Sequence, residues 1–402
     1  MMWFAYKILE FCGPCTIKFV QWYASRQEKF QFTRVFKNIY HHEFRETEYI
    51  FYEAFDELIE HKIELESNTP LYSGSIGQIY KGIDKESNTT VAVKIRHPRI
   101  EYKWTFLFIK ILSWLFNFIN EVDVDGFMQN FLTQLDFVQE AKNMIKMREC
   151  FKHNENIVIP EPLYYSQDVI VMTWEDSVGI NTIESRTEKY KYIMLMWLFN
   201  QDCVINNQCV HGDLHEGNWG IRDGKMIVYD FGLCICDNAD IKEFVVSYEK
   251  SDLRNIIRLV VRRCVTRPNV DIFEQLENDP VCVEMANKKV NISYLLIELR
   301  NLVRKYNLGR IKSPIISFGI AYGIVEKIIE KHKLDELDGS DNNYRTYITE
   351  QITFAKMLGF SKLVDHFKSN LKKGKSFEYT EVNDSINLFY TTGTLNPGTP
   401  AT

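Results

Sequence analysis

The sequence predicts an α+β fold in two lobes, and three observations carry this prediction. The β-branched run Val91–Lys94 alternates as a strand does and follows a glycine-containing turn, which indicates an antiparallel sheet in the N-terminal half. From residue 242 to residue 371 apolar residues recur at helical spacing, and prolines divide the region into separate helices. Between these regions lie two short polar motifs, at His211–Asn218 and Asp230–Gly232.

The two polar motifs have the residue types and spacing of a phosphoryl-transfer centre. In the catalytic loop of kinases an Asp meets the acceptor hydroxyl and an Asn five residues later binds Mg²⁺, while a following Asp-Phe-Gly supplies the second metal ligand. Asp213 and Asn218 have this spacing, and Asp230 begins an Asp-Phe-Gly triplet. Each motif alone is short, so the two in register are the informative signal. We therefore expect a bilobal protein-kinase-like fold in which Asp213 acts on the acceptor and Asn218 and Asp230 bind Mg²⁺.

An upstream segment supplies the residues expected to bind the phosphates of ATP. Lys94 ends its strand where kinases pair a lysine with the α- and β-phosphates. Gly74, Ser75 and Gly77 match the later part of a glycine-rich loop. Tyr72 stands where the first glycine of that loop would be. Glycines allow backbone N–H groups to approach phosphate oxygens. Alone, the stretch is equally compatible with an ordinary hairpin turn, and its order among the other motifs favours phosphate binding.

A helix is expected to supply the carboxylate that pairs with Lys94. Apolar residues recur at spacings of three and four from Gly126 to Phe151, and Glu140 lies within this run. Asp136, Glu140 and Asn143 would share one face of such a helix. Surface helices commonly carry a polar stripe of this kind, and the kinase order of the other motifs favours Glu140 as the partner of Lys94.

Length and composition are those of a globular chain with two cores. The chain has 402 residues, of which 45% are hydrophobic and 25% charged. Its net charge of −6 indicates no basic surface for nucleic acid. Nine cysteines, an odd number, predict free thiols in a reducing intracellular compartment and no disulfide framework.

The N-terminal part of the chain shows no targeting signal that we can recognise. Residues 1–20 carry charges that interrupt a signal peptide, and they lack the arginine-rich pattern of a transit peptide, so the sequence predicts a cytoplasmic protein. The apolar segment Trp104–Ile119 is short for a bilayer span. We expect this segment to be buried in the N-lobe, with contact to a partner or a membrane surface as the alternative.

These motifs together resemble the UbiB-like, or ADCK/aarF-domain, family of atypical kinases associated with ubiquinone. The resemblance rests on the catalytic motifs, on the His-Pro pair that follows the lysine strand, and on two altered motifs. Lys18 to Gln21 is similar to the KxGQ motif of the family, with Val20 in place of the glycine. Gln134 to Asp136 is similar to its ExD motif, with Gln134 in place of the Glu.

The resemblance implies a lid over the active site. In the family the KxGQ lysine pairs with the first acidic residue of ExD, which here implies lid contacts from Lys18, Gln21, Gln134 and Asp136. Gln134 cannot form that ion pair, so we expect a looser lid held at most by a neutral hydrogen bond. Gly74 replaces an alanine of the family and is expected to free the backbone φ angle at the phosphates. Both departures favour a more protein-kinase-like site.

The resemblance implies a Mg·ATP-dependent atypical kinase or ATPase linked to isoprenoid-quinone or lipid metabolism. It also implies a lipid, a quinone precursor or a membrane surface as partner, and a mitochondrial or membrane-peripheral location as the alternative to cytoplasm. A protein Ser/Thr kinase and a nucleotide-binding pseudokinase scaffold are the competing functions.

The motifs divide the chain into four expected parts. A helical extension with the KxGQ-like segment covers residues 1–66, and an N-lobe with inserted helices covers residues 67–176. A helical C-lobe with the catalytic loop covers residues 177–375, and a mobile tail covers residues 376–402. Within the N-lobe, Val169 to Glu175 is expected to be the strand that leads into the adenine-binding hinge.

Overall fold

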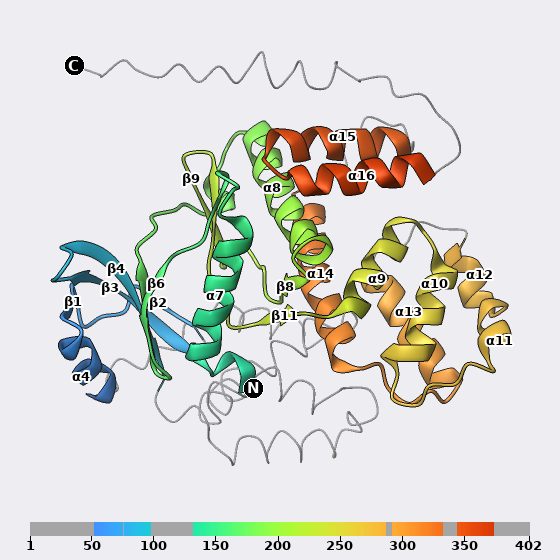
Figure 1. Cartoon of the computed structure of the whole chain (residues 1–402), viewed down its shortest axis with the longest axis horizontal. Coiled ribbons are helices and arrows are strands. Elements are labelled where there is room, and N and C mark those ends of the chain that lie inside the picture. Colours follow the sequence, from blue (N-terminus) through green and yellow to red (C-terminus); the bar gives the residue numbers. More distant parts are fainter. Residues whose placement is uncertain (1–51, 75, 98–131, 287–291, 333–343, 374–402) are drawn as a thin grey trace, which may run out of the picture.

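The computed structural model describes residues 52–74, 76–97, 132–286, 292–332 and 344–373 (Figure 1). The sequence-based expectations that lie outside these residues concern Lys18, Gln21, Ser75, the apolar segment 104–119 and the tail from residue 376. Within the described residues a sheet-rich N-lobe is followed by a mostly helical C-lobe. The predicted bilobal α+β fold is confirmed.

The N-lobe is built on a six-stranded sheet whose pairs are all antiparallel. The strands follow the order β1-β3-β4-β7-β6, and β2 pairs with β3. Their bounds are Ile63–Leu65 (β1), Tyr72–Ser73 (β2), Gly77–Asp84 (β3), Thr89–Arg96 (β4), Pro162–Tyr165 (β6) and Val169–Thr173 (β7). Helix α4, Tyr52–Glu60, contacts β1. The sheet therefore begins upstream of residue 67, where we expect the N-lobe to start.

Strand β4 shows how the sequence aims Lys94. Successive side chains of a strand point to opposite faces of its sheet. Val91 and Val93 are fully buried on the face that packs on α4. Ala92 packs on the other face, in the core that contains Phe137 of helix α7. Lys94 shares the face of Ala92, so it points toward α7.

Helix α7 is shorter than its apolar pattern indicates. It runs from Phe137 to Phe151, and the expected continuous helix from Gly126 is wrong at residue 136. Asp136 has extended backbone angles, and its side chain accepts a hydrogen bond from Gln139 N at 3.0 Å. An Asp in this conformation caps a new helix and ends the preceding helical turn. Asp136 is therefore an N-cap, and Glu140 and Asn143 lie on the helix proper.

The core of the C-lobe combines one long helix with short strands. Helix α8, Arg186–Ile205, begins at the N-cap Ser185 and is buried along its second half. The short elements around it are β5 (Ile157–Val158), η3 (Ile180–Thr182), β8 (Cys209–His211), β9 (Trp219–Arg222), β10 (Lys225–Val228) and β11 (Cys234–Cys236). Strands β9 and β10 form a hairpin, whose turn residues Asp223 and Gly224 both have positive φ.

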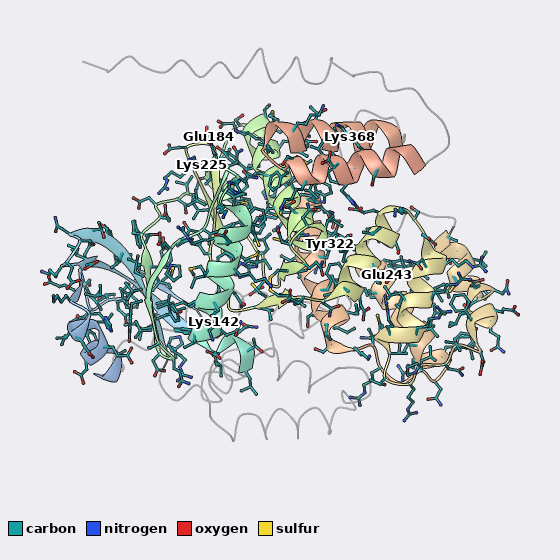
Figure 2. The ribbon with its side chains drawn as sticks, viewed as in Figure 1. Lys142, Glu184, Lys225, Glu243, Tyr322 and Lys368 are labelled. Atoms are coloured by element: carbon teal, nitrogen blue, oxygen red, sulfur yellow. A yellow bond between two sulfur atoms is a disulfide. The ribbon has the colours of Figure 1, made fainter. Side chains whose placement is uncertain are left out.

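The rest of the C-lobe is helical, as the apolar spacing predicts. Its helices are α9 (Ala239–Glu249), α10 (Leu253–Leu259), the π-helix Val260–Cys264, α11 (Phe273–Glu277), α12 (Pro280–Ala286), α13 (Ile292–Lys305), α14 (Ser313–Lys331), α15 (Tyr344–Met357) and α16 (Ser361–Lys373). Helix α14 contacts α8, β8 and β11 (Figure 1). Tyr322, labelled in Figure 2, accepts a hydrogen bond from Gln201 of α8 at 2.6 Å.

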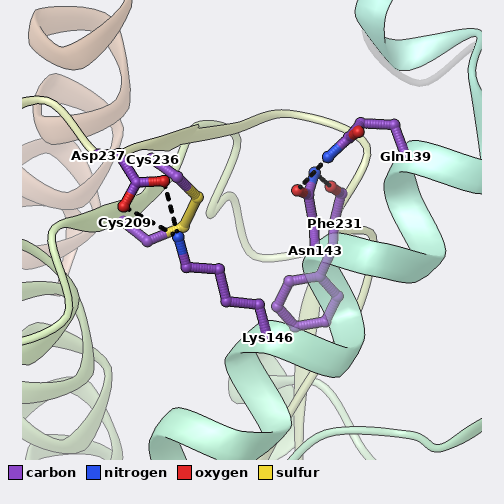
Figure 3. The surroundings of a disulfide bond; sticks show 7 residues. All are labelled: Gln139, Asn143, Lys146, Cys209, Phe231, Cys236 and Asp237. Carbon is purple, nitrogen blue, oxygen red and sulfur yellow. Dashed lines mark hydrogen bonds and ion pairs between the residues drawn. A yellow bond between two sulfur atoms is a disulfide. The ribbon is translucent and has the colours of Figure 1, made fainter.

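The expectation of free thiols is wrong for two of the cysteines. Cys209 and Cys236 form a disulfide, because β8 and β11 pair antiparallel with these two residues directly opposite each other (Figure 3). Beside the disulfide, Lys146 of α7 pairs with Asp237 at 3.1 Å (Figure 3). The cysteines that are free in the described part of the chain are Cys150, Cys203, Cys234, Cys264 and Cys282. No helix in that part has the length and apolar character needed to cross a bilayer.

Candidate active site

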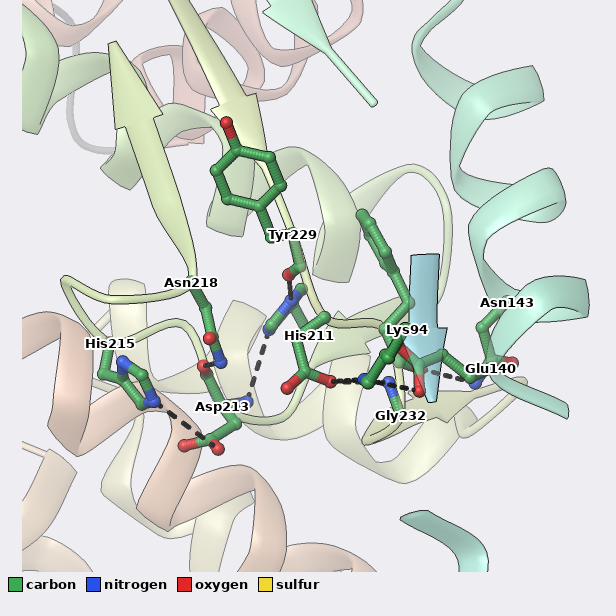
Figure 4. A network of polar contacts seen from close by, with 11 residues as sticks. Lys94, Glu140, Asn143, His211, Asp213, His215, Asn218, Tyr229 and Gly232 are labelled. Carbon is green, nitrogen blue, oxygen red and sulfur yellow. Dashed lines mark hydrogen bonds and ion pairs between the residues drawn. The ribbon is translucent and has the colours of Figure 1, made fainter. Parts of the chain in front are cut away.

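The structure places Lys94 and Glu140 in a buried ion pair between β4 and α7 (Figure 4). Lys94 Nζ lies 2.7 and 2.8 Å from the two carboxylate oxygens of Glu140. The side chain of Glu140 is 1% exposed and that of Lys94 is 11% exposed. Such a charge-assisted contact in a water-poor environment fixes the ammonium group in one place.

Asp230 reaches the same lysine from the C-lobe. Its carboxylate lies 3.5 Å from Lys94 Nζ and is 46% exposed, so one side faces Lys94 and the other remains open to solvent. Asp230 has a φ of +54°, a left-handed conformation that Asp and Asn tolerate better than most residues. Gly232 donates a backbone hydrogen bond to Asp230 at 3.2 Å. A Cβ on Gly232 would lie only 3.3 Å from Glu140, so a glycine keeps this junction compact.

The catalytic loop holds Asp213 and Asn218 through its own backbone. Asn218 Nδ2 donates to the carbonyl of Asp213 at 2.8 Å, which fixes the orientation of the amide (Figure 4). Asn218 N donates to His215 O at 2.8 Å, and His215 N donates to Asp213 O at 2.9 Å. Tyr229 N then donates to Asn218 O at 2.8 Å, which ties the loop to the residue before Asp230. The loop and the Asp-Phe-Gly segment therefore form one connected unit.

His211 and Asn143 form hydrogen bonds with backbone groups of this unit, a role that the sequence alone does not reveal. His211 Nδ1 accepts a hydrogen bond from Asp213 N at 3.3 Å, so its Nε2–H donates to Tyr229 O at 3.0 Å. Burial lowers the pKa of His211, which favours this neutral form. Asn143 of α7 donates to Phe231 O at 2.9 Å. In the sequence, only the positions of these two residues indicate such a role. His211 begins the catalytic-loop motif, and Asn143 follows Glu140 on the same face of the helix.

The glycine-containing turn between β2 and β3 differs in detail from expectation. Neither Gly74 nor Gly77 has a positive φ, and the expected freedom of the backbone at Gly74 stays a prediction. Gly77 is required by packing, because a Cβ there would lie 2.6 Å from the carbonyl oxygen of Ile95 on β4. His97 Nε2 donates to Gly74 O at 2.8 Å. His97, which follows β4, thus holds the turn.

The residues of this site suit Mg²⁺ held together with phosphates. Mg²⁺ is usually bound by one or two carboxylates, with phosphate oxygens and water completing its octahedron. Asp230 and Asn218 offer such a partial set, and no three His, Cys, Asp or Glu side chains of the described residues converge as an all-protein metal site. Lys94 beside Asp230 provides the cation that phosphates need. The donor set therefore fits Mg·ATP better than a metal ion alone.

Of the expected lid contacts, two can be placed. Gln134 is 8% exposed and lies in the helical turn before α7, and Asp136 caps α7 through Gln139. The cap role of Asp136 is local and needs no lid. Whether Gln134 meets Lys18 stays a prediction, since Lys18 lies outside the described residues.

Burial shifts the proton affinities of the ion pair. It raises the pKa of Glu140 to about 7, although Lys94 favours the charged carboxylate. Burial also disfavours the charge of Lys94, but the nearby carboxylates of Asp230 and Glu140 outweigh this, and the pKa of Lys94 is raised. Lys94 therefore remains charged, and Glu140 is the group of the pair that titrates near neutrality.

Because the pKa of Glu140 is raised in the folded protein, we expect the stability of the protein to depend on pH. This pKa of about 7 in the folded protein lies above the ordinary value of 4.5. The folded protein therefore holds a proton that the unfolded chain releases, and the free energy of unfolding falls as the pH rises across this window. We expect a fall of up to about 3 kcal/mol in urea denaturation of the wild type. The free energy of unfolding of Glu140→Gln should fall less over the same pH range, because its amide does not titrate. Equal falls in the two proteins would assign the pH dependence to other groups.

The fold, the contact of Lys94 with Glu140 and Asp230, and the adjoining loop that carries Asp213 define the class of the protein as a kinase-like domain. A family model described as "ABC1 atypical kinase-like domain" matches residues 34–260. The match covers more than half of the 402 residues, so the chain belongs to the ABC1 atypical kinase-like domain family. The resemblance to UbiB-like and aarF-domain kinases is thereby confirmed.

Curated relatives carry kinase names at low identity. "Probable serine/threonine-protein kinase abkC" of Dictyostelium discoideum is 26% identical over 235 residues, which are 53% of this chain and 34% of that protein. "Protein ACTIVITY OF BC1 COMPLEX KINASE 1, chloroplastic" of Arabidopsis thaliana is 30% identical over 186 residues, 41% of this chain and 27% of that protein. "Probable protein kinase UbiB" of Cronobacter sakazakii is 24% identical over 273 residues, 60% of this chain and 49% of that protein. The chain thus spans half or less of the length of these relatives.

Among solved structures, a Mycobacterium tuberculosis protein in complex with erythromycin is similar to this chain. The two are 16% identical, and the match covers 68% of this chain and 78% of that one. At a TM-score of 0.40 this similarity does not establish a common overall arrangement.

Proposed function

We propose that this protein is a Mg·ATP-dependent phosphotransferase or ATPase, linked to isoprenoid-quinone or lipid metabolism. One observation carries the proposal: Lys94 contacts Glu140 at 2.7 Å and Asp230 at 3.5 Å, across the two lobes. A buried Lys–Glu pair beside the Asp of Asp-Phe-Gly is the arrangement that catalytically competent kinases require. The UbiB name among the relatives supports the link to quinones.

Each residue of the site has a proposed role. Mg·ATP, when bound, supplies the transferable phosphoryl group and the metal charge that stabilises its transfer. Lys94, held by Glu140, binds phosphate oxygens, and Asp230 and Asn218 bind the metal. Asp213 orients the acceptor hydroxyl or water and takes its proton. We further propose that Gly74, Ser75 and Gly77 cover the phosphates, and that the linker after β7 contacts the base.

A protein Ser/Thr kinase is the second candidate. The observation that favours it is the printed name of the Dictyostelium discoideum relative, which is 26% identical over 235 residues. The two candidates differ only in the acceptor, which none of the described side chains identifies.

ATP turnover by the purified chain tests the proposal. Turnover should be measured alone, with quinone-precursor analogues, with lipid vesicles and with generic protein substrates. Stimulation by the quinone analogues or lipids supports the first candidate, and phosphorylation of protein supports the second. A folded chain that binds Mg·ATP and turns nothing over would be a nucleotide-binding scaffold.

Asp230→Asn is expected to abolish the magnesium-dependent part of nucleotide binding. Asn tolerates the left-handed φ of residue 230, so the fold should persist while the metal-binding charge is lost. For the wild type at a hundredfold excess of ligand over Kd, thermal unfolding should show about 2.7 kcal/mol of stabilisation. Asp223→Asn is a matched control, because Asp223 also has a positive φ but lies in the β9–β10 turn. The absence of any Mg·ATP-dependent shift in folded wild type would refute nucleotide binding.

A further inference from the structure

Glu216 connects the catalytic loop to the end of helix α14. Its carboxylate accepts hydrogen bonds from Lys331 Nζ and from His332 Nε2, the latter at 2.8 Å. Asn181 of η3 donates a third hydrogen bond at 3.2 Å. The residues that meet here are 115 and 116 positions apart in the sequence. The contact therefore joins the loop to a segment that is distant in the sequence.

Three hydrogen bonds hold the carboxylate of Glu216. Lys331 and Asn181 donate to Oε2, and His332 donates to Oε1. The side chain of Glu216 is 21% exposed and that of His332 is 7% exposed, so this side of the contact is shielded from water. The side chain of Lys331 is 53% exposed, so its side of the contact faces solvent. The shielded hydrogen bond to the carboxylate contributes more than an exposed ion pair would.

This contact adds a polar attachment of the loop to the helical C-lobe. The hydrogen bonds described above for the loop are internal to it or run to the segment around Asp230. They fix Asp213 relative to Asn218 and Asp230. The buried side chain of Leu214 joins the loop to the C-lobe core, and Glu216 adds a second attachment nearer to Asn218. Glu216 lies between Asp213 and Asn218 in the sequence, so a movement of its side chain displaces the backbone that carries both residues.

Helix α14 is suited to serve as the fixed reference. It packs against α8, β8 and β11, and Phe318, Ala321 and Val325 on it are fully buried. It also lies beyond residues 34–260, the part that the family model matches. The helix is therefore a part of this chain whose connection to the site is not described by the shared kinase-like motifs.

We propose that Glu216 is a positioning residue and that α14 completes the active site by holding it through Lys331 and His332. The proposal rests on the proposed function, since it concerns how Asp213 and Asn218 are placed for phosphoryl transfer. Glu216 itself touches no reacting atom. Its effect is to keep the loop in one position while the acceptor is bound.

Glu216→Gln is the variant that tests the proposal, because it removes the charge and keeps the size of the side chain. The turnover number should fall about tenfold, equivalent to about 1.4 kcal/mol of activation free energy. The Kd for Mg·ATP should rise by a smaller factor than turnover falls, since Lys94 and Asp230 are untouched and Asn218 is the one nucleotide-site residue that the loop carries. Amide exchange of residues 211–220 should accelerate. Lys331→Met should act in the same direction, and Lys331→Arg should restore the wild-type values because it keeps the charge.

Glu243→Gln is the matched control. Glu243 of α9, labelled in Figure 2, pairs with Arg263 of the π-helix, and neither residue belongs to the loop. This variant should leave loop exchange and turnover unchanged. Unchanged turnover and exchange in folded Glu216→Gln, or equal losses in Glu243→Gln, would overturn the proposal.

The test separates this proposal from the proposed function. If the wild type turns over no ATP, the proposed function fails, while the exchange comparison between Glu216→Gln and Glu243→Gln still decides whether Glu216 holds the loop. If Glu216→Gln does not fold, Lys331→Met and Lys331→Arg provide the same comparison from the other side of the contact. Equal loop exchange in those two variants would then overturn the proposal.

Discussion

Asp213→Asn is expected to reduce turnover by about 10²–10⁴-fold, the usual contribution of a positioned general base. The amide cannot take the proton of the acceptor. The loop should persist, because its hydrogen bonds to His211, His215 and Asn218 use the backbone of Asp213, and Asn keeps the size of the side chain that lies 3.9 Å from His215 Nε2. Affinity for Mg·ATP should therefore stay within about twofold of wild type.

Single-turnover kinetics and calorimetric titration together check this expectation. The first reports the chemical step, and the second reports nucleotide affinity. Asp223→Asn is again the control, since it makes the same substitution in the exposed β9–β10 turn. Equal ATP consumption by wild type and Asp213→Asn, after contaminating ATPases are removed, would remove Asp213 from the mechanism.

Lys94→Met should destabilise the folded protein by about 3–5 kcal/mol at pH 8, because it leaves a buried carboxylate without its partner. Glu140 is 1% exposed and cannot turn to solvent without repacking α7. The loss should be smaller at pH 5, where the unpaired Glu140 takes up a proton instead of holding a buried charge. The double variant Lys94→Met with Glu140→Leu should recover much of the lost stability.

Guanidinium denaturation at the two pH values measures these differences. Lys85→Met is the control, because Lys85 pairs with Glu64 where both side chains are more than half exposed. Exposed pairs contribute about 0–1 kcal/mol, so this variant should remain close to wild type at both pH values. A Lys94→Met protein with the same loss at pH 5 and pH 8 would show that Glu140 is not the source of the loss.

The order of the motifs predicted the lobes and the strands that place the site. Lys94 on β4 and the helical C-lobe follow from local patterns of alternation and helical spacing. The start of α7 was not predictable in this way, because the apolar spacing continues through residue 136. The N-cap geometry of Asp136 decides that boundary, and the same residue type inside a helix leaves a similar pattern.

The contacts between distant segments were beyond the sequence patterns. The Cys209–Cys236 pairing depends on the register of two strands of three residues each, too short for a pattern to define. The contact of Glu216 with Lys331 and His332 depends on how α14 packs across the C-lobe. An odd cysteine count and a polar loop residue are equally consistent with no contact at all. Tertiary packing decided both.

The disulfide has a topological consequence. It closes a covalent ring from Cys209 to Cys236, and this ring contains the catalytic loop, the β9–β10 hairpin and Asp230. A protease that cuts the exposed turn at Asp223 would open the ring without releasing either half of the chain. The nicked protein would run as one band on a denaturing gel until a reductant is added, and then as two fragments.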